Sequence, residues 1–181
     1  MDVAPYLDTL LLLLVTVAAI KDLESRRIPN RLLLAGLSGA LVLHLLSPHP
    51  LDALLAALGG FSLGLAVLLP FYLLRGMAAG DVKMMATVGA FTGAGDALHI
   101  VIVAWCVGGV MALVIIIVNG RLRLAMSNLW AMLRPMLLRL PRGFTPGVDG
   151  YRSAGSIPYG VAIAAGTIVH LVGRYGPTPL G

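Results

Sequence analysis

The chain has 181 residues, of which 59% are hydrophobic and only 12% are charged, and its formal net charge is +5. An ordinary soluble domain is about 45–50% apolar and about 25% charged, so this chain has too little polar surface to cover a globule in water. The composition excludes a soluble enzyme, a disordered tail and a nucleic-acid-binding module. It predicts a polytopic membrane protein whose surroundings are the lipid bilayer. The single cysteine, Cys106, excludes an internal disulfide and a CxxC metal site.

Apolar segments of the length that crosses a bilayer, roughly 20 residues, recur along the chain. The sequence therefore predicts an all-α protein, with about six transmembrane helices and a single membrane domain over residues 1–181. The helices are expected at 3–20, 31–46, 51–74, 82–93, 97–118 and 157–172. No Lys or Arg precedes Lys21, so the first segment lacks the basic start of a cleaved signal peptide and is expected to be a retained helix.

The basic residues test this segmentation. Twelve of the 13 fall in the loops after the first, third and fifth segments. The N-terminal tail and the other two loops carry acidic residues instead, which are Asp2, Asp8, Asp52 and Asp96. By the positive-inside rule, this pattern predicts a multi-pass protein of the inner (plasma) membrane with both termini outside. Five spans would break the alternation, so the charges favour the short fourth helix.

The last cytoplasmic loop, residues 119–155, is expected to contain an amphipathic helix over 121–140. At about 100° per residue, its polar side chains fall on one half of a helix, and Leu, Met and Trp130 fall on the other. Such a helix lies on the membrane surface, and Pro135 should kink or divide it. A surface anchor on anionic lipid is the simpler interpretation. A docking element for a partner or a substrate leader is the alternative.

Two aspartates stand at the inner ends of predicted helices. Asp22 follows the first segment and Asp81 opens the fourth, which places both on the cytoplasmic side at similar depth. An ionisable residue at a membrane helix end is costly unless it is paired or hydrated, so both are functional candidates. Each also has a simpler role, Asp81 as a helix N-cap and Asp22 as an ion-pair partner of Lys21 or Arg26. Two carboxyl groups held close together share a proton, and such a pair can activate a water and polarise a carbonyl.

Three motifs make the hypothesis more specific. The run Asp22-x-x-x-Arg26-Arg27-Ile28-Pro29-Asn30 resembles the first catalytic motif of the type IV prepilin peptidases. Gly76-Met77-Ala78-Ala79-Gly80-Asp81-Val82-Lys83 resembles their Gly-x-Gly-Asp motif, and Ser156-Ile157-Pro158-Tyr159-Gly160-Val161-Ala162 resembles the segment that opens their last helix. The three occur in order and cover nearly the whole chain. Ala78 replaces the first glycine of the second motif, which would cause strain if that position were left-handed.

The resemblance implies a membrane-embedded aspartic endopeptidase with Asp22 and Asp81 as its catalytic pair. Its substrates would be prepilin-like membrane proteins, in which a short basic leader precedes an apolar helix. Cleavage would occur after a glycine at the cytoplasmic membrane face, and no metal or organic cofactor is implied. The chain lacks the paired cysteines that accompany N-methyltransferase activity in larger members. It therefore resembles the short, peptidase-only branch that serves Flp-type (tight-adherence) pili.

Other functions stay open at this point. A non-enzymatic scaffold of a pilus or secretion assembly would tolerate asparagine at both aspartates. A transporter would need carboxylates near mid-membrane, and the sequence has no evident inverted repeat. A preflagellin peptidase is a related possibility. An intramembrane aspartyl protease of the presenilin type is another, although the Pro-Ala-Leu segment of those proteins is absent.

Several single residues carry smaller predictions. Asn30 is expected to cap the second helix. Lys83 follows Asp81 by two positions, so on a regular helix it should point away from it and anchor at the membrane interface. Glu24 is expected to be a solvated loop charge. The glycines expected to serve helix packing are Gly89, Gly93, Gly108 and Gly109. The histidines, which are placed toward the outer side and in no metal site, are His44, His49, His99 and His170.

Overall fold

The computed structural model describes residues 3–74, 76–120 and 158–175, and in addition residues 122, 123, 126, 127 and 130. Over these residues the protein is helical and contains no strand. The chain divides into two compact units, one of Met1–Gly108 with Pro158–Gly181 and one of Gly109–Ile157. The predicted surface helix over 121–140 falls largely outside the described residues, so it stays a prediction.

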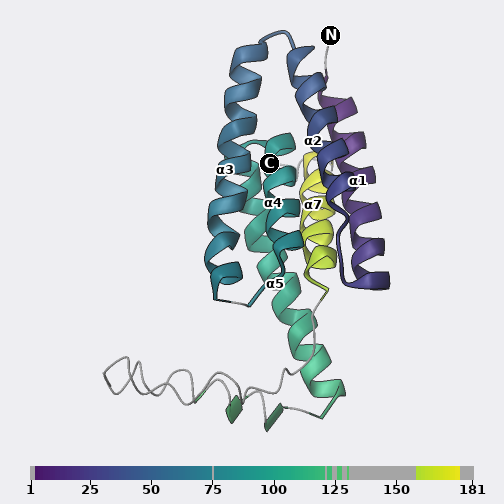
Figure 1. Ribbon diagram of the computed structural model, residues 1–181, viewed down its shortest axis with the longest axis vertical. Coiled ribbons are helices and arrows are strands. Elements are labelled where there is room, and N and C mark those ends of the chain that lie inside the picture. Colours follow the sequence, from purple (N-terminus) through teal and green to yellow (C-terminus); the bar gives the residue numbers. More distant parts are fainter. Residues whose placement is uncertain are drawn as a thin grey trace, which may run out of the picture. The chain divides into compact units, whose positions relative to one another are not determined.

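Each predicted apolar segment is confirmed as a helix (Figure 1). The described helices are α1 (Ala4–Ser25), α2 (Asn30–Leu45), α3 (Pro50–Leu73), α4 (Ala79–Thr92), α5 (Ala94–Val118) and α7 (Tyr159–Tyr175). The largest boundary difference is at the end of α1, and smaller ones occur at the starts of α4 and α5 and at the end of α7. Helix α1 continues through its polar end because Lys21 and Glu24, one turn apart, form an ion pair of 2.8 Å. Both aspartates consequently lie within helices rather than beside them.

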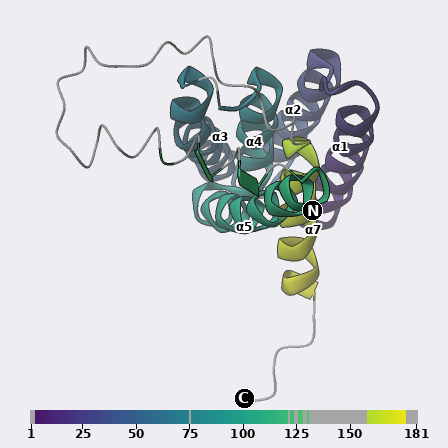
Figure 2. The ribbon, with the colours of Figure 1, turned by 90° about the horizontal axis from the view of Figure 1, so that it is seen from below.

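Helix α4 forms the centre of the first unit, where it packs against α1, α2, α3 and α7 (Figure 2). Ten of its 14 residues are buried. A helix of this length extends about 21 Å at 1.5 Å per residue, less than the roughly 30 Å of a bilayer core. Because protein surrounds α4 on several sides, this segment does not need the length of a lipid-facing helix.

Helices α3 and α4 meet backbone to backbone. A Cβ atom built on Gly60 of α3 would overlap the carbonyl oxygen of Gly89, and one built on Gly89 would overlap that of Gly60. One turn along α3, a Cβ on Gly64 would lie 2.5 Å from the carbonyl oxygen of Met85. Small residues at one-turn spacing are what allow membrane helices to approach this closely. The predicted packing role of Gly89 is therefore confirmed.

The other three glycines of that prediction differ from one another. A Cβ on Gly108 would lie 2.7 Å from the ring of Tyr159, so this glycine also serves helix packing. Gly93 ends α4 with φ +80°, a left-handed conformation that glycine adopts without steric cost. No described atom lies within 4 Å of a Cβ built on Gly109, so among the described residues the predicted packing contact of Gly109 is not found.

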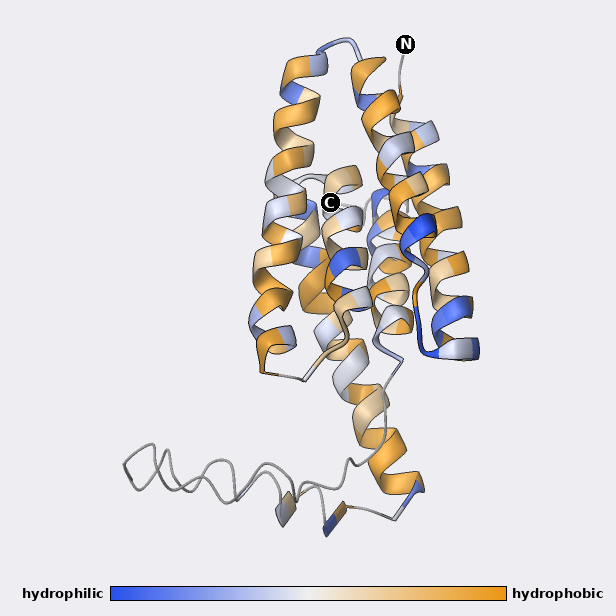
Figure 3. Cartoon of the chain, in the orientation of Figure 1, coloured by the Kyte–Doolittle hydropathy of each residue, from blue (hydrophilic) through white to orange (hydrophobic). Residues whose placement is uncertain are grey.

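The outer helix faces carry apolar side chains (Figure 3). Leu55 of α3 and Leu113 and Val114 of α5, for example, are each more than half exposed. Two described helices, α3 and α5, are long and apolar enough to cross a membrane, judged by length and composition. Exposed leucines on such helices are typical of surfaces that face lipid. Six spans remain a prediction based on the loop charges.

Candidate active site

Asp22 and Asp81, the two candidate site residues, line the same cavity, which has a volume of about 270 Å³. Asp22 lies near the end of α1 and Asp81 in the first turn of α4, and each residue is only 6% exposed. They are close enough for the charge on Asp22 to act on Asp81. The fold thus brings together two carboxyl groups that are distant in the sequence.

The first turn of α7 holds Asp22. The backbone N–H of Gly160 donates a hydrogen bond of 2.9 Å to Oδ2 of Asp22. Backbone N–H groups in the first turn of a helix have no partner within that helix and favour an anion. A Cβ built on Gly160 would lie 2.9 Å from the same oxygen and 3.2 Å from Cγ. Glycine at this position therefore lets the carboxylate approach the helix end.

Of the two partners considered for Asp22, Lys21 bonds to Glu24 instead. Arg26 does act on Asp22 electrostatically. Arg26 has φ 53°, and its N–H closes α1 by donating to the carbonyl oxygen of Asp22 at 3.0 Å. This left-handed residue turns the chain so that Ile28 packs over Gly80, where an added Cβ would lie 3.4 Å from that of Ile28. The turn thereby holds the end of α1 against the start of α4.

Asp81 does not cap α4 as the sequence suggested. The N-cap is Ala78, and Asp81 is the third residue of the helix. The Asp81 carboxylate accepts a hydrogen bond from the backbone of Ala78, which is the returning half of a capping box. Ala78 itself has φ −79° and ψ 149°, an extended conformation that any residue adopts. The strain expected from alanine at this motif position therefore does not arise.

The two carboxyl groups differ in acidity. Both lie just beyond the predicted spans, 3–20 and 82–93. Burial raises the pKa of Asp22 above 3.8, while the Gly160 N–H and the Arg26 charge lower it. For Asp81, burial and then the negative charge of Asp22 raise the pKa to about 7. Near neutral pH, the pair is therefore expected to hold about one proton, with Asp22 as the anion and Asp81 as the acid.

This difference predicts how stability depends on pH. Folded Asp81 keeps its proton up to about pH 7, whereas in the unfolded chain it loses the proton near 3.8. Since the unfolded state then binds fewer protons, the free energy of unfolding should fall as pH rises from about 4 to 7. Asp81→Asn should reduce this dependence of the free energy of unfolding on pH. At pH 8, the variant in detergent should therefore melt at a higher temperature than wild type. Asp52→Asn, on an exposed position of α3, is the control. An unchanged pH dependence in Asp81→Asn would contradict the assignment.

Lys83 and Asn30 also belong to this cavity, which the sequence did not indicate. Nζ of Lys83 donates a 3.1 Å hydrogen bond to Oδ1 of Asn30, and both residues line the cavity. Asn30 therefore makes no side-chain cap on α2, whose N-cap is Pro29. The expectation that Lys83 points away from Asp81 considered only helix geometry. A four-carbon side chain reaches further than the direction of its Cβ implies.

Tyr159 and Gly160 are the site residues that the sequence did not single out. The Tyr159 hydroxyl is buried without a hydrogen-bond partner among the described residues, and it lies within electrostatic range of Asp81. The motif Ser156–Ala162 marks this segment, but nothing in it indicates a contact with α1. Within the described part of the chain, no group of three His, Cys, Asp or Glu side chains could hold a metal ion.

Comparison with known protein families relates more than half of the chain to one of them. The model of the type IV leader peptidase family matches residues 9–113, which is more than half of the chain and includes both Asp22 and Asp81. No curated protein and no solved structure matches significantly. The matched range contains the first two motifs, and the cavity that joins them supports the same assignment. The chain therefore belongs to the type IV leader peptidase family.

Proposed function

We propose that this protein is a membrane-embedded aspartic endopeptidase that removes the short basic leader from type IV prepilins. Membership of the family supports leader peptidase activity on prepilins. The observation that carries the aspartic mechanism is the placement of two buried carboxyl groups in one cavity, with the pKa of Asp81 raised to about 7. A pair that shares a proton near neutral pH has the acid and the base that peptide hydrolysis needs.

In the proposed mechanism, Asp22 acts first as the base. It takes a proton from a water molecule, whose oxygen attacks the scissile carbonyl carbon while protonated Asp81 donates to the carbonyl oxygen. The tetrahedral intermediate then collapses, the C–N bond breaks and the leaving amine takes a proton from Asp22. The carbonyl re-forms and returns a proton to Asp81. The Gly160 N–H, 2.9 Å from Oδ2, keeps the Asp22 carboxylate oriented.

The finer features of the proposal follow the sequence. The substrate branch is the Flp type, without methyltransferase activity, because the paired cysteines of larger members are absent. The topology has six spans with both termini outside, so the site faces the cytoplasm of the inner membrane. Basic residues in the 121–140 segment would hold that segment against anionic lipid.

Cleavage of a prepilin by the purified protein tests the proposal. Wild-type protein in detergent should convert a prepilin into mature pilin, with the leader recovered and its end defined by mass spectrometry. The Asp22→Asn/Asp81→Asn double variant should give no product. A non-enzymatic scaffold would give no product with wild type, and a peptidase with another mechanism would give equal product with the double variant. Either outcome would overturn the aspartic peptidase assignment.

Gly160→Ala should impair cleavage without preventing folding. The added Cβ would lie 2.9 Å from Oδ2 of Asp22, so the carboxylate must move away from its N–H donor. We expect kcat to fall roughly 10-fold or more, in line with the loss of one positioned hydrogen bond to a charged group. Gly173→Ala on the same helix is the matched control, since a Cβ there meets no described atom within 4 Å. Equal rates for the two variants would argue against a positioning role for Gly160.

A further inference from the structure

The candidate active-site cavity continues into a groove along α2. A second cavity, of about 290 Å³, shares Asn30 and Lys83 with it. A third, of about 520 Å³, shares Leu34, Leu37 and Phe61 with the second. Because neighbouring cavities share lining residues, the three lie in a row along α2, and this row is called here the α2–α3 groove. It begins at the residues that line the candidate active site and reaches His44, near the other end of α2.

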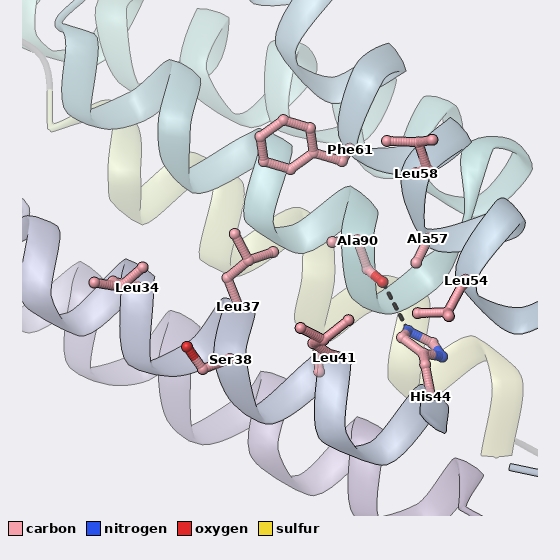
Figure 4. A pocket seen from close by; sticks show the side chains of 11 residues that line it. Leu34, Leu37, Ser38, Leu41, His44, Leu54, Ala57, Leu58, Phe61 and Ala90 are labelled. Carbon is pink, nitrogen blue, oxygen red and sulfur yellow. Dashed lines mark hydrogen bonds between the residues drawn. The ribbon is translucent and has the colours of Figure 1, made fainter. Parts of the chain in front are cut away.

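The walls of the groove, formed by α2 and α3, are mainly apolar, and both helices are held against α4. Figure 4 shows Leu37 and Leu41 of α2 facing Leu54 and Phe61 of α3. Helix α3 is held on α4 by the glycine contacts at Gly60 and Gly64, while α2 is held by His44, whose Nε2 lies 2.9 Å from the carbonyl oxygen of Ala90. That carbonyl belongs to the last turn of α4, where backbone acceptors lack helical partners. The His44 side chain thus provides a hydrogen-bond partner for the Ala90 carbonyl oxygen. The remaining surface of this cavity is mainly hydrocarbon.

The polarity of the lining side chains falls along the length of the groove. Charged and polar residues, among them Lys83 and Asn30, line the end at the aspartates, while in the outer cavity the only polar side chains are those of Ser38 and His44. From Asn30 to His44, the wall formed by α2 extends about 21 Å at 1.5 Å per residue. A peptide held at the aspartates that continues as an apolar helix meets cavities of increasingly apolar lining in this direction.

We propose that the α2–α3 groove binds the apolar helix that follows the scissile bond of the substrate. This inference rests on the proposed function. The cavities are in the size range that accepts side chains, so the substrate helix would place one face into the groove at i, i+3, i+4 and i+7 positions. Walls that are already fixed to α4 reduce the ordering cost of binding. The groove would thereby align the leader junction with the two carboxyl groups.

Filling the groove tests the proposal. Ala57→Trp, on the α3 wall, should raise KM for a full-length, membrane-anchored prepilin by roughly 10-fold or more. Leu55→Trp is the matched control on the same helix, since Leu55 is 59% exposed and lies outside the lining. A short peptide that ends a few residues after the scissile bond should be cleaved equally by wild type and both variants, which also shows that the variants fold. Unchanged KM for the full-length prepilin in Ala57→Trp would overturn the groove assignment.

A photo-crosslinking residue at Ser38 identifies the occupant directly. In the inactive Asp22→Asn/Asp81→Asn background, we expect a crosslink to the apolar helix of the prepilin, located by mass spectrometry. The same residue at Leu13, an exposed position of α1, should not capture the prepilin. Crosslinks only to lipid, or only to a second copy of this chain, would overturn the inference. If wild type cleaves neither the full-length prepilin nor the peptide, the proposed function fails, whereas loss of the groove effects alone leaves that function standing.

Discussion

Asp22→Asn and Asp81→Asn are each expected to lower the rate of leader cleavage at least roughly 10³-fold, with the protein still folded in the membrane. Asparagine keeps the shape of the side chain, but it can neither accept a proton as a base nor supply one as an acid. Because each carboxyl group has its own role in the proposed mechanism, one cannot replace the other. The measurement is the initial rate of mature pilin formation at a saturating prepilin concentration.

The control for these variants is Asp52→Asn, which removes an exposed aspartate at the start of α3 and should cleave at the wild-type rate. Asp81→Glu is a second comparison. It keeps an acid but lengthens the side chain inside a cavity of about 270 Å³, so we expect partial activity rather than full loss. Full processing by either single asparagine variant would eliminate the catalytic pair.

Leucine in place of Gly89 is expected to separate α3 from α4 and to lower the free energy of unfolding by about 3 kcal/mol or more. A Cβ at this position overlaps the carbonyl oxygen of Gly60, which is backbone and cannot rotate away as a side chain would. The loss should appear as a melting temperature lower by about 5 °C or more in detergent. Because α4 carries Asp81, cleavage should fall in parallel.

Gly95→Leu is the matched control for this packing prediction, because a Cβ on Gly95 meets no described atom within 4 Å. It should change the melting temperature by no more than about 2 °C. Smaller substitutions at Gly89 should rank by size, with alanine less damaging than leucine. A Gly89→Leu protein as stable as Gly95→Leu would show that the two helices do not pack through these glycines.

Apolar segments located the helices well, but hydropathy misplaced the ends that carry the site. Lys21, Asp22 and Glu24 made the end of α1 look like a loop, although the Lys21–Glu24 pair keeps it helical to Ser25. In the same way, Ala79 and Gly80 looked like an approach to α4 but lie in its first turn. Helix ends are set by local hydrogen bonds and caps, which an average over many residues does not detect.

The two aspartates could be proposed from charge pattern and motif, whereas their supporting contacts could not. The Gly160–Asp22 hydrogen bond joins residues 138 positions apart, and backbone N–H groups leave no mark in a sequence. Lys83 and Asn30, which are 53 positions apart, form a contact that depends on how α2 lies against α4. The packing role of Gly89 could be predicted from the sequence, but its partner Gly60 could not, because the contact depends on how α3 and α4 are arranged.

The order in which the chain is synthesised gives the Gly160 contact a further consequence. The donor to Asp22 belongs to α7, which leaves the ribosome after α1, α4 and the Arg26 turn at the end of α1 have been made. During translation at about 5–20 residues per second, the intervening 138 positions take roughly 7–28 s to appear. The nascent protein therefore holds Asp22 without its orienting partner for that time. If Asp22 and Asp81 are the catalytic pair, the protein can complete its active site only after α7, the last described helix, has been made.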